Sequence, residues 1–163
     1  MFLRNLNYRR GAALLEATLA LPLLVLITLA AVQFGQAVVV EQAIGAAADE
    51  AAREAAKAAN PQEMQTLVNQ MLASVSLVAD TGSGVRVDVQ YAVGIEYHFG
   101  DDSLGTPDAP MFSQGPANSP DVNEVRVTIR ANFKYTKVPD MLGYFGLSFQ
   151  NRRCESSALA RFQ

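Results

Sequence analysis

A single carboxylate lies at the start of a long apolar stretch near the N-terminus. Residues 9–22 read RRGAALLEATLALP, and Glu16 is followed by residues 17–40, which carry no charge. An isolated carboxylate within a bilayer costs about 2.5–3.5 kcal/mol even on lenient insertion scales. A cut between Gly11 and Ala12 would supply a cationic partner, because it creates a new α-amino group. Such a cut would therefore account for a carboxylate at this position.

The apolar stretch has the length of a membrane helix. Residues 17–40 span roughly 36 Å as a helix, against a hydrocarbon core of about 30 Å. The preceding residues contain Arg4, Arg9 and Arg10 and no acidic side chain. By the positive-inside rule, this pattern predicts a cytoplasmic N-terminus and an extracytoplasmic C-terminal part. We expect four segments: a basic leader (1–11), a transmembrane or assembly helix (12–40), its extracytoplasmic continuation (41–60) and a small domain (61–163).

Three interpretations compete for the N-terminus. A secretory signal peptide would be cut near Ala30 or Ala31, but its apolar region would be too long and would contain Glu16. An uncleaved signal anchor tolerates the length but gives the carboxylate no purpose. A cut after Gly11 accounts for both the length and the carboxylate.

The same residues resemble the start of the type IV pilin superfamily, and within it the TadE-like minor pilins or pseudopilins of the tight-adherence (Flp) system. The resemblance rests on Arg-Arg-Gly11, on Glu16 as the fifth residue after the glycine, and on Pro22. It implies cleavage by a prepilin peptidase after Gly11. It also implies that Glu16 neutralises the Ala12 amine of a neighbouring subunit, and that Pro22 kinks the helix to ease extraction.

The resemblance further implies where the protein acts and with what. The expected partners are the prepilin peptidase, other pilin or pseudopilin subunits, the assembly machinery, and inner-membrane lipid before assembly. The expected location is the bacterial inner membrane, crossed once, with passage into an extracellular pilus. The function implied is that of a structural or assembly-initiating subunit in adhesion or secretion.

The composition beyond residue 40 predicts two helices. Ten of the seventeen residues 43–59 are alanine, so the first helix is expected to continue from residue 12 to residue 59. A narrow alanine strip would let another helix or a sheet approach closely: Ala43, Ala47, Ala51 and Ala55. Asn60-Pro61 ends it and starts a second helix, with Asn60 as N-cap. The second helix has an apolar stripe that indicates core packing: Met64, Leu67, Val68, Met71, Leu72 and Val75.

Alternating residues predict a sheet after Gly84. Every odd position from 85 to 99 is apolar, and the same alternation recurs over 125–135. A weaker third strand is expected over 149–161. The predicted fold class is α+β: a long N-terminal helix, a short second helix and an antiparallel sheet of about three strands.

The segment between the first two strands, residues 100–121, is rich in Gly, Pro, Ser and Asp. This composition predicts an irregular loop, which we expect to contact a partner. Asp101, Asp102 and Asp108 offer calcium ligands, but they lack EF-hand spacing, and a solvated loop is favoured.

Little else in the sequence suggests chemistry. His98, the one histidine, falls on the polar face of a strand, and Cys154, the one cysteine, is interpreted as a small apolar strand residue. Without the three leader arginines, ten basic residues face sixteen acidic ones, which argues against nucleic acid as a partner. We therefore expect no enzyme activity, no cofactor and no metal.

Two functions remain open at this stage. The first is the pilin-like subunit, and the alternative is a membrane-anchored extracytoplasmic binding or sensor domain that keeps its leader. The mature N-terminus distinguishes them: Ala12 for the pilin, Met1 for the anchor, and a residue near Val32 for a secreted domain.

Overall fold

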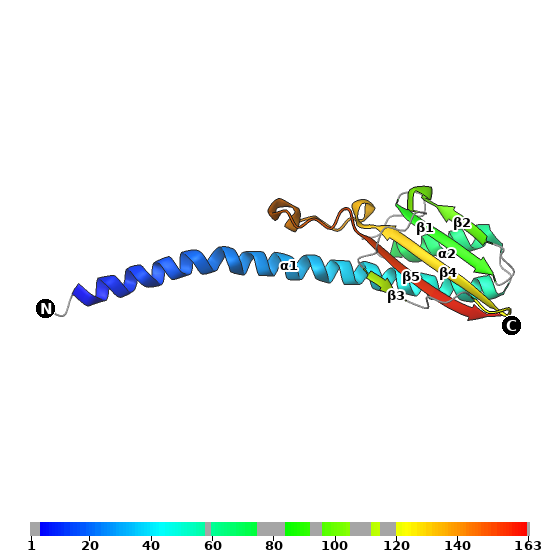
Figure 1. Ribbon diagram of the computed structural model, residues 1–163, viewed down its shortest axis with the longest axis horizontal. Coiled ribbons are helices and arrows are strands. Elements are labelled where there is room, and N and C mark those ends of the chain that lie inside the picture. Colours follow the sequence, from blue (N-terminus) through cyan, green and yellow to red (C-terminus); the bar gives the residue numbers. More distant parts are fainter. Residues whose placement is uncertain are drawn as a thin grey trace.

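Apolar and alanine-rich sequence builds one long helix, whose C-terminal half carries a small α+β domain (Figure 1). The computed structural model describes residues 4–57, 60–74, 84–91, 96–104, 112–114 and 120–162. The first helix, α1 (Arg4–Ala56), begins before the predicted residue 12 and runs without interruption through Gly11 and Pro22. The predicted kink at Pro22 stays a prediction.

The second helix, α2 (Pro61–Ser74), begins where the sequence predicts. The side-chain oxygen of Asn60 accepts a hydrogen bond from the backbone N–H of Gln62 at 3.2 Å, which is the expected N-cap. Met64, Val68 and Leu72 are fully buried, so the apolar stripe packs into the core as expected. Val75 and the predicted end of the helix lie outside the described residues.

The sheet has five described strands, in the order β2-β1-β4-β5-β3. Neighbours from β2 to β5 pair antiparallel, and β3 pairs parallel with β5 at the edge. The strands are β1 (Val85–Tyr91), β2 (Glu96–Gly100), β3 (Phe112–Gln114), β4 (Glu124–Asn132) and β5 (Arg153–Arg161). The predicted α+β class is confirmed, with more strands than expected.

The alternating segment 85–99 is a hairpin rather than one strand. Val87 pairs with Phe99 and Val89 with Tyr97, so odd positions face odd positions across the two strands. The alternation therefore continues unchanged through the turn, and periodicity alone does not distinguish one long strand from two.

Three other predictions about the strands need correction. The strand predicted over 125–135 ends at Asn132, where the side-chain oxygen of Asn132 accepts from Lys134 N and starts a 3₁₀ turn. The third strand begins at Arg153, not at residue 149. The segment 100–121 is not wholly irregular, since it contains β3 and a 3₁₀ turn (Asp102–Leu104).

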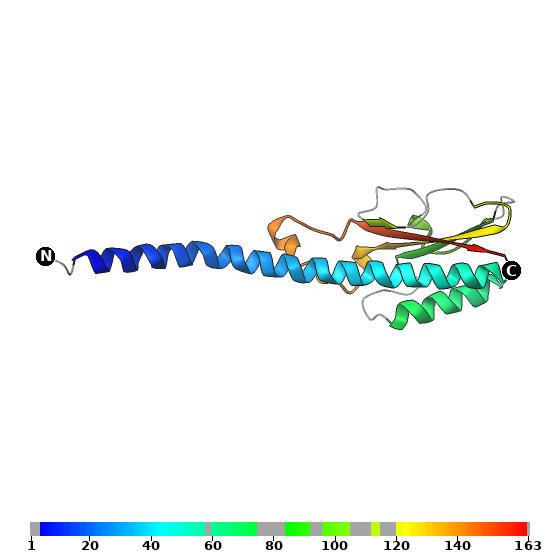
Figure 2. The same cartoon turned by 90° about the horizontal axis from the view of Figure 1, so that it is seen from below.

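Both helices lie on one face of the sheet (Figure 2). α1 packs against β4 and β5, and α2 lies alongside α1. Ala47, Ala51 and Ala55, three members of the predicted alanine strip, are essentially fully buried, and Ala43 is partly buried. The small side chains bring the backbone of α1 close to the sheet, as predicted. The sheet contributes the buried side chains Val85, Val87, Val89, Val125, Val127, Ile129 and Ala131.

Candidate functional site

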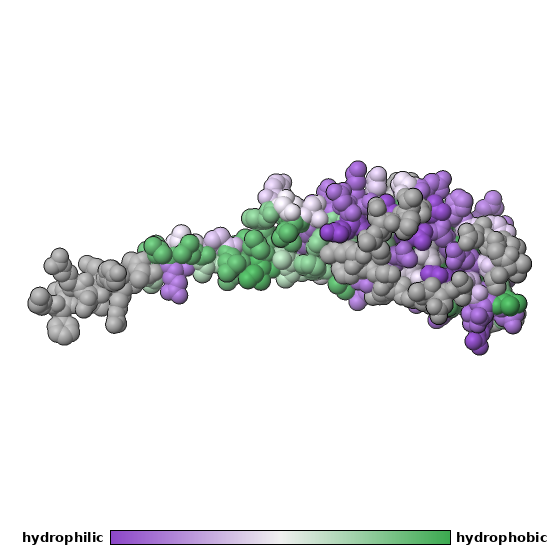
Figure 3. Space-filling model, viewed as in Figure 1, coloured by the Kyte–Doolittle hydropathy of each residue, from purple (hydrophilic) through white to green (hydrophobic). Residues whose placement is uncertain are grey.

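The N-terminal part of α1 is a bare apolar helix. Leu14 and Leu24 are 70% and 64% exposed, and Figure 3 shows green apolar side chains along the helix outside the domain. Among the described residues, one helix segment, 13–56, is long and apolar enough to cross a membrane, and only 17% of its most apolar window is buried. This helix suits single-pass membrane anchoring.

Polar groups within this helix are arranged for an apolar environment, with one exception. The hydroxyls of Thr18 and Thr28 donate to the carbonyls of Leu14 and Leu24 at 2.7 and 2.8 Å. Such bonds satisfy a hydroxyl without water. Glu16 remains exposed among apolar neighbours and is the one charged residue in 13–32.

The backbone places Ala12 four residues before Glu16, which is about one helical turn. After a cut at Gly11, the amine and the carboxylate would therefore lie on the same face of α1. Gly11 itself is helical, so a peptidase would first have to unwind this turn. Glycine lowers that cost, because it favours the helix by about 1 kcal/mol less than alanine does.

A second feature of the site was not predicted from the sequence. Residues 138–149, called the arm below, leave the sheet after β4 and run back along α1 towards its N-terminal end (Figures 1 and 2). The arm contains a 3₁₀ turn (Leu142–Phe145). Gly146 ends that turn in the left-handed conformation, with a φ of 81°. The uncharged run MLGYFGLSF, rich in aromatic and apolar residues, is the signal that could have revealed it.

Gln33 of α1 holds the arm. Its side chain is 1% exposed; its Oε1 accepts from the backbone N–H of Leu142 at 2.9 Å, and its Nε2 donates to Asp140 Oδ1 at 3.2 Å. The ring of Phe149 packs edge-on against Phe34, with centroids 5.0 Å apart. These hydrogen bonds and this ring contact tie the domain to α1 at Gln33 and Phe34, within the predicted 12–40 segment.

Asp140 organises the arm from its other side. The Ser148 hydroxyl donates to Asp140 Oδ2 at 2.5 Å, and this bond is the main reason that the pKa of Asp140 lies below its usual range. Burial opposes the shift, while Gln33 and backbone N–H groups add to it. The carboxylate is therefore ionised at neutral pH, when it can accept all these bonds.

Replacing Gln33 with leucine is expected to release the arm. The Leu142 N–H would lose its buried acceptor, which costs about 1–3 kcal/mol. Amide hydrogen exchange at Leu142 should accelerate by about tenfold or more. Gln36→Leu is the matched control, because the buried Oε1 of Gln36 has no hydrogen-bond partner in the described structure. Equal protection in both variants would contradict the assigned role of Gln33.

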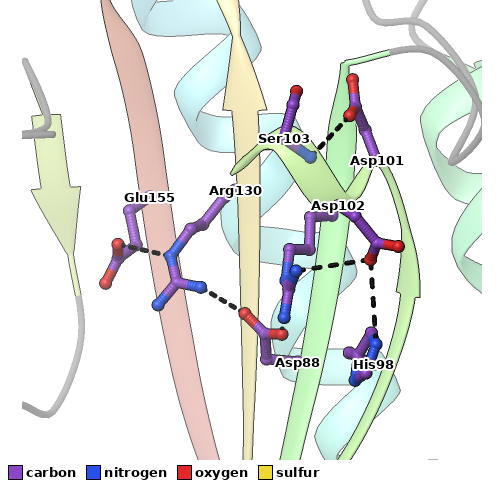
Figure 4. A network of polar contacts seen from close by, with 8 residues as sticks. Asp88, His98, Asp101, Asp102, Ser103, Arg130 and Glu155 are labelled. Carbon is purple, nitrogen blue, oxygen red and sulfur yellow. Dashed lines mark hydrogen bonds and ion pairs between the residues drawn. The ribbon is translucent and has the colours of Figure 1, made fainter. Parts of the chain in front are cut away.

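The outer face of the sheet carries a network of ion pairs (Figure 4). Arg86 and Arg130 are directly opposite on β1 and β4, a repulsive arrangement. Asp88 contacts both guanidinium groups: Arg86 Nε lies 2.7 Å from Asp88 Oδ1, and Arg130 Nη1 contacts Asp88 Oδ2. Glu155 accepts from Arg130 Nε at 3.0 Å. The network therefore joins three strands and neutralises its own charge.

Removing the charge of Asp88 should destabilise the domain. Asp88→Asn removes the carboxylate that contacts both guanidinium groups, so Arg86 keeps only the exposed Asp102, at 3.5 Å, and Arg130 keeps only Glu155 among the described ion pairs. Because these side chains are largely buried, we expect the free energy of unfolding to fall by about 1–3 kcal/mol. Urea unfolding of the full chain in detergent, followed by circular dichroism, measures the loss. Glu50→Gln, which removes an exposed pair with Arg53, should change it by less than about 0.5 kcal/mol.

His98 and the aspartates next to it show no arrangement of a base with a nucleophile. His98 Nε2 lies 3.7 Å from Asp102 Oδ1 (Figure 4). The Ser103 side chain bonds to Asp101 instead. Asp101 also accepts from the backbone N–H groups of Gly84 and Ser103, and these bonds lower its pKa. Asp101 and Asp102 thus make contacts with neighbouring residues of the domain, while Asp108 lies outside the described residues.

Cys154 is buried in β5, in line with its interpretation as a small apolar residue. Its Sγ lies 3.5 Å from the Ala131 carbonyl oxygen. Burial raises the pKa of the thiol to about 12. The fraction present as reactive thiolate at pH 8 is then about a thousandfold lower than for an ordinary cysteine.

The predicted site residues do not converge on one pocket. Four of them belong to the N-terminal part of α1: Gly11, Ala12, Glu16 and Pro22. The other two, His98 and Cys154, lie in strands of the sheet. The candidate site is therefore a helix surface rather than a cleft.

Comparison with known proteins supports this emphasis on the helix. The family model for TadE-like proteins matches residues 11–53. The match begins at Gly11, includes Glu16 and Pro22 and ends within α1, so the resemblance to TadE-like proteins of the tight-adherence system is confirmed over the helix. No curated protein and no solved structure matches the chain.

Proposed function

We propose that this TadE-like chain is a minor pilin, or pseudopilin, of a tight-adherence pilus or a related secretion filament. A prepilin peptidase trims it after Gly11, and α1 then carries it from the membrane into the filament or its base. One observation carries the proposal: an exposed apolar helix bears a lone carboxylate five residues after a glycine. The family match to residues 11–53 supports the same conclusion.

The exposed surface of α1 serves two environments in turn. Before assembly, residues 13–32 lie in lipid, with the leader arginines in the cytoplasm and the α+β domain outside. After assembly, the same apolar surface packs against the helices of other subunits. Glu16 pairs with the Ala12 amine of a neighbour and thereby fixes the axial register between subunits. The domain needs neither a catalytic group nor a cofactor for this role.

The continuous helix through Gly11 favours a second candidate, a membrane-anchored binding or sensor domain with an uncleaved leader. An anchor needs an unbroken helix from the basic leader to the domain, and α1 provides one. In that case Glu16 would have no amine to neutralise. The two functions thus differ in whether the peptide bond between Gly11 and Ala12 is cut.

Intact-mass measurement of the membrane-extracted chain, made in cells that contain the cognate prepilin peptidase, tests the proposal. A mature chain beginning at Ala12 supports the pilin function. A chain beginning at Met1 supports the anchor, and a chain beginning near Val32 indicates a secreted domain. Cells without the peptidase provide the control, and there the leader should remain attached.

A further inference from the structure

The arm places exposed aromatic side chains beside the membrane-spanning part of α1. Tyr144 is 94% exposed, Phe145 56% and Leu147 58%. The 3₁₀ turn that includes Tyr144 and Phe145 lies at the end of the arm that projects from the domain towards the N-terminus of α1, and Leu147 follows this turn in the sequence (Figure 1). They are held there by the contacts of Gln33 with Leu142 and Asp140.

The length of α1 fixes the level of the arm relative to a bilayer. Residues 13–32 rise by roughly 30 Å, the thickness of a hydrocarbon core, so Gln33 falls near its boundary on the domain side. Leu26, Leu29 and Ala30 are less exposed than their neighbours, and α1 contacts the 3₁₀ turn of the arm. Leu26 lies about 10 Å below Gln33 along the helix, within the usual depth of an interfacial segment.

The chemistry of the arm suits an anionic lipid interface. Residues 141–151 carry no charge, and tyrosine is enriched where the membrane meets water. The sequence from residue 134 to residue 153 holds four basic residues and one acidic residue, Asp140, although the chain as a whole carries a net charge of −3. The basic residues are Lys134, Lys137, Arg152 and Arg153. Basic groups at this level attract anionic headgroups.

We propose that the arm is a second membrane contact, which inserts Tyr144, Phe145 and Leu147 into the leaflet on the domain side of the bilayer that α1 crosses. The inference rests on the proposed membrane anchoring by α1. The arm then fixes the height and tilt of the domain above the lipid, because Gln33 connects it firmly to the helix.

Depth-dependent fluorescence quenching tests this contact in the full chain. Tyr144→Cys is labelled with an apolar fluorophore and reconstituted into phosphatidylcholine–phosphatidylglycerol vesicles that carry nitroxides at shallow or deep positions. The buried Cys154 should not react, so the unsubstituted chain serves as the labelling blank. Two further reporters are Leu24→Cys, within the bare helix, and Val122→Cys, 80% exposed before β4 and at the end of the domain remote from the arm.

The expected result is severalfold quenching of the Tyr144 label by shallow nitroxides, quenching of the Leu24 label by deep ones, and little quenching at Val122. Adding Phe145→Ser and Leu147→Ser should reduce quenching at position 144 severalfold and leave position 24 unchanged. This second result shows that the arm, rather than the fluorophore, makes the contact.

Two outcomes overturn the proposal in different ways. If position 24 is quenched while positions 144 and 122 behave alike, α1 crosses the membrane and the arm makes no lipid contact of its own. If position 24 is not quenched either, the membrane anchoring fails and the arm proposal fails with it.

Discussion

Gly11→Leu is expected to leave the leader attached to the protein. The backbone of α1 is helical through Gly11, so trimming requires this turn to open and the peptidase to approach the main chain closely. Leucine adds a side chain at the cut bond and favours the helix more strongly than glycine does. The fraction of chains beginning at Ala12 should fall by more than about tenfold, measured by intact mass in cells that contain the peptidase.

Gly35→Leu is the matched control for this prediction. Gly35 lies in the same helix, and a Cβ built there would have no atom within 4 Å, so the domain should accept the change. The Gly35→Leu chain should be trimmed fully. If Gly11→Leu is also trimmed fully, processing does not take place at this bond.

Glu16→Gln is expected to separate processing from assembly. The amide should still be trimmed and inserted, since it removes a charge from the apolar helix rather than adding one. In packed helices, however, the Ala12 amine of the neighbour would lose its partner, and an unpaired buried charge costs about 3–5 kcal/mol. Incorporation into sheared filaments should therefore fall by at least about a hundredfold, measured by immunoblot against the membrane fraction.

Glu50→Gln provides the comparison for Glu16→Gln. Glu50 lies farther along α1, where its carboxylate pairs with Arg53 at 3.7 Å in an exposed position. This variant should assemble in normal amounts. Normal assembly of Glu16→Gln would contradict the proposed ion pair, because its charge would then have no role in stacking subunits.

The elements predicted well from the sequence are those defined by local patterns. The start of α2 follows from the Asn60-Pro61 dipeptide, since the asparagine oxygen caps the helix and proline suits its first position. α1 ends at Ala56, before the predicted residue 59. Most of the alanine strip is buried as expected, and so are the odd-numbered residues of β1 and β4 except the half-buried Tyr91. The predicted inward positions Tyr97 and Tyr135 are exposed instead. In these segments, the spacing of the residues along the chain decides which face of the helix or strand they occupy.

The features that the sequence did not reveal depend on distant partners. The hairpin pairing of β1 and β2 preserves the alternation of a single strand, so the alternation does not separate the two strands. β3 lies within a segment whose composition predicts a loop, and it pairs in parallel with the much later β5. The arm depends on the hydrogen bond from the Leu142 N–H to Gln33, which is more than a hundred residues away in sequence. A local sequence pattern does not indicate a hydrogen bond between residues so far apart.

The signal for the candidate site on α1 lies in consecutive residues, so it can be recognised without the fold, while the roles of these residues stay predictions. The spacing of Gly11, Glu16 and Pro22 and the uncharged run after them is linear information. Once the segment is helical, this spacing alone sets the relative positions of the three residues. The height of the domain on that helix, in contrast, is set by Gln33 and the arm.

The unbroken course of α1 has a mechanical consequence. A pull on its N-terminal end reaches the sheet without meeting a hinge, since the described helix is continuous from Arg4 to Ala56. The buried contacts of Ala47, Ala51 and Ala55 are spread along the helix axis, so axial force loads them in shear, and they must slip together rather than peel apart one by one. A motor that draws the helix out of the bilayer would therefore lift the domain as rigid cargo.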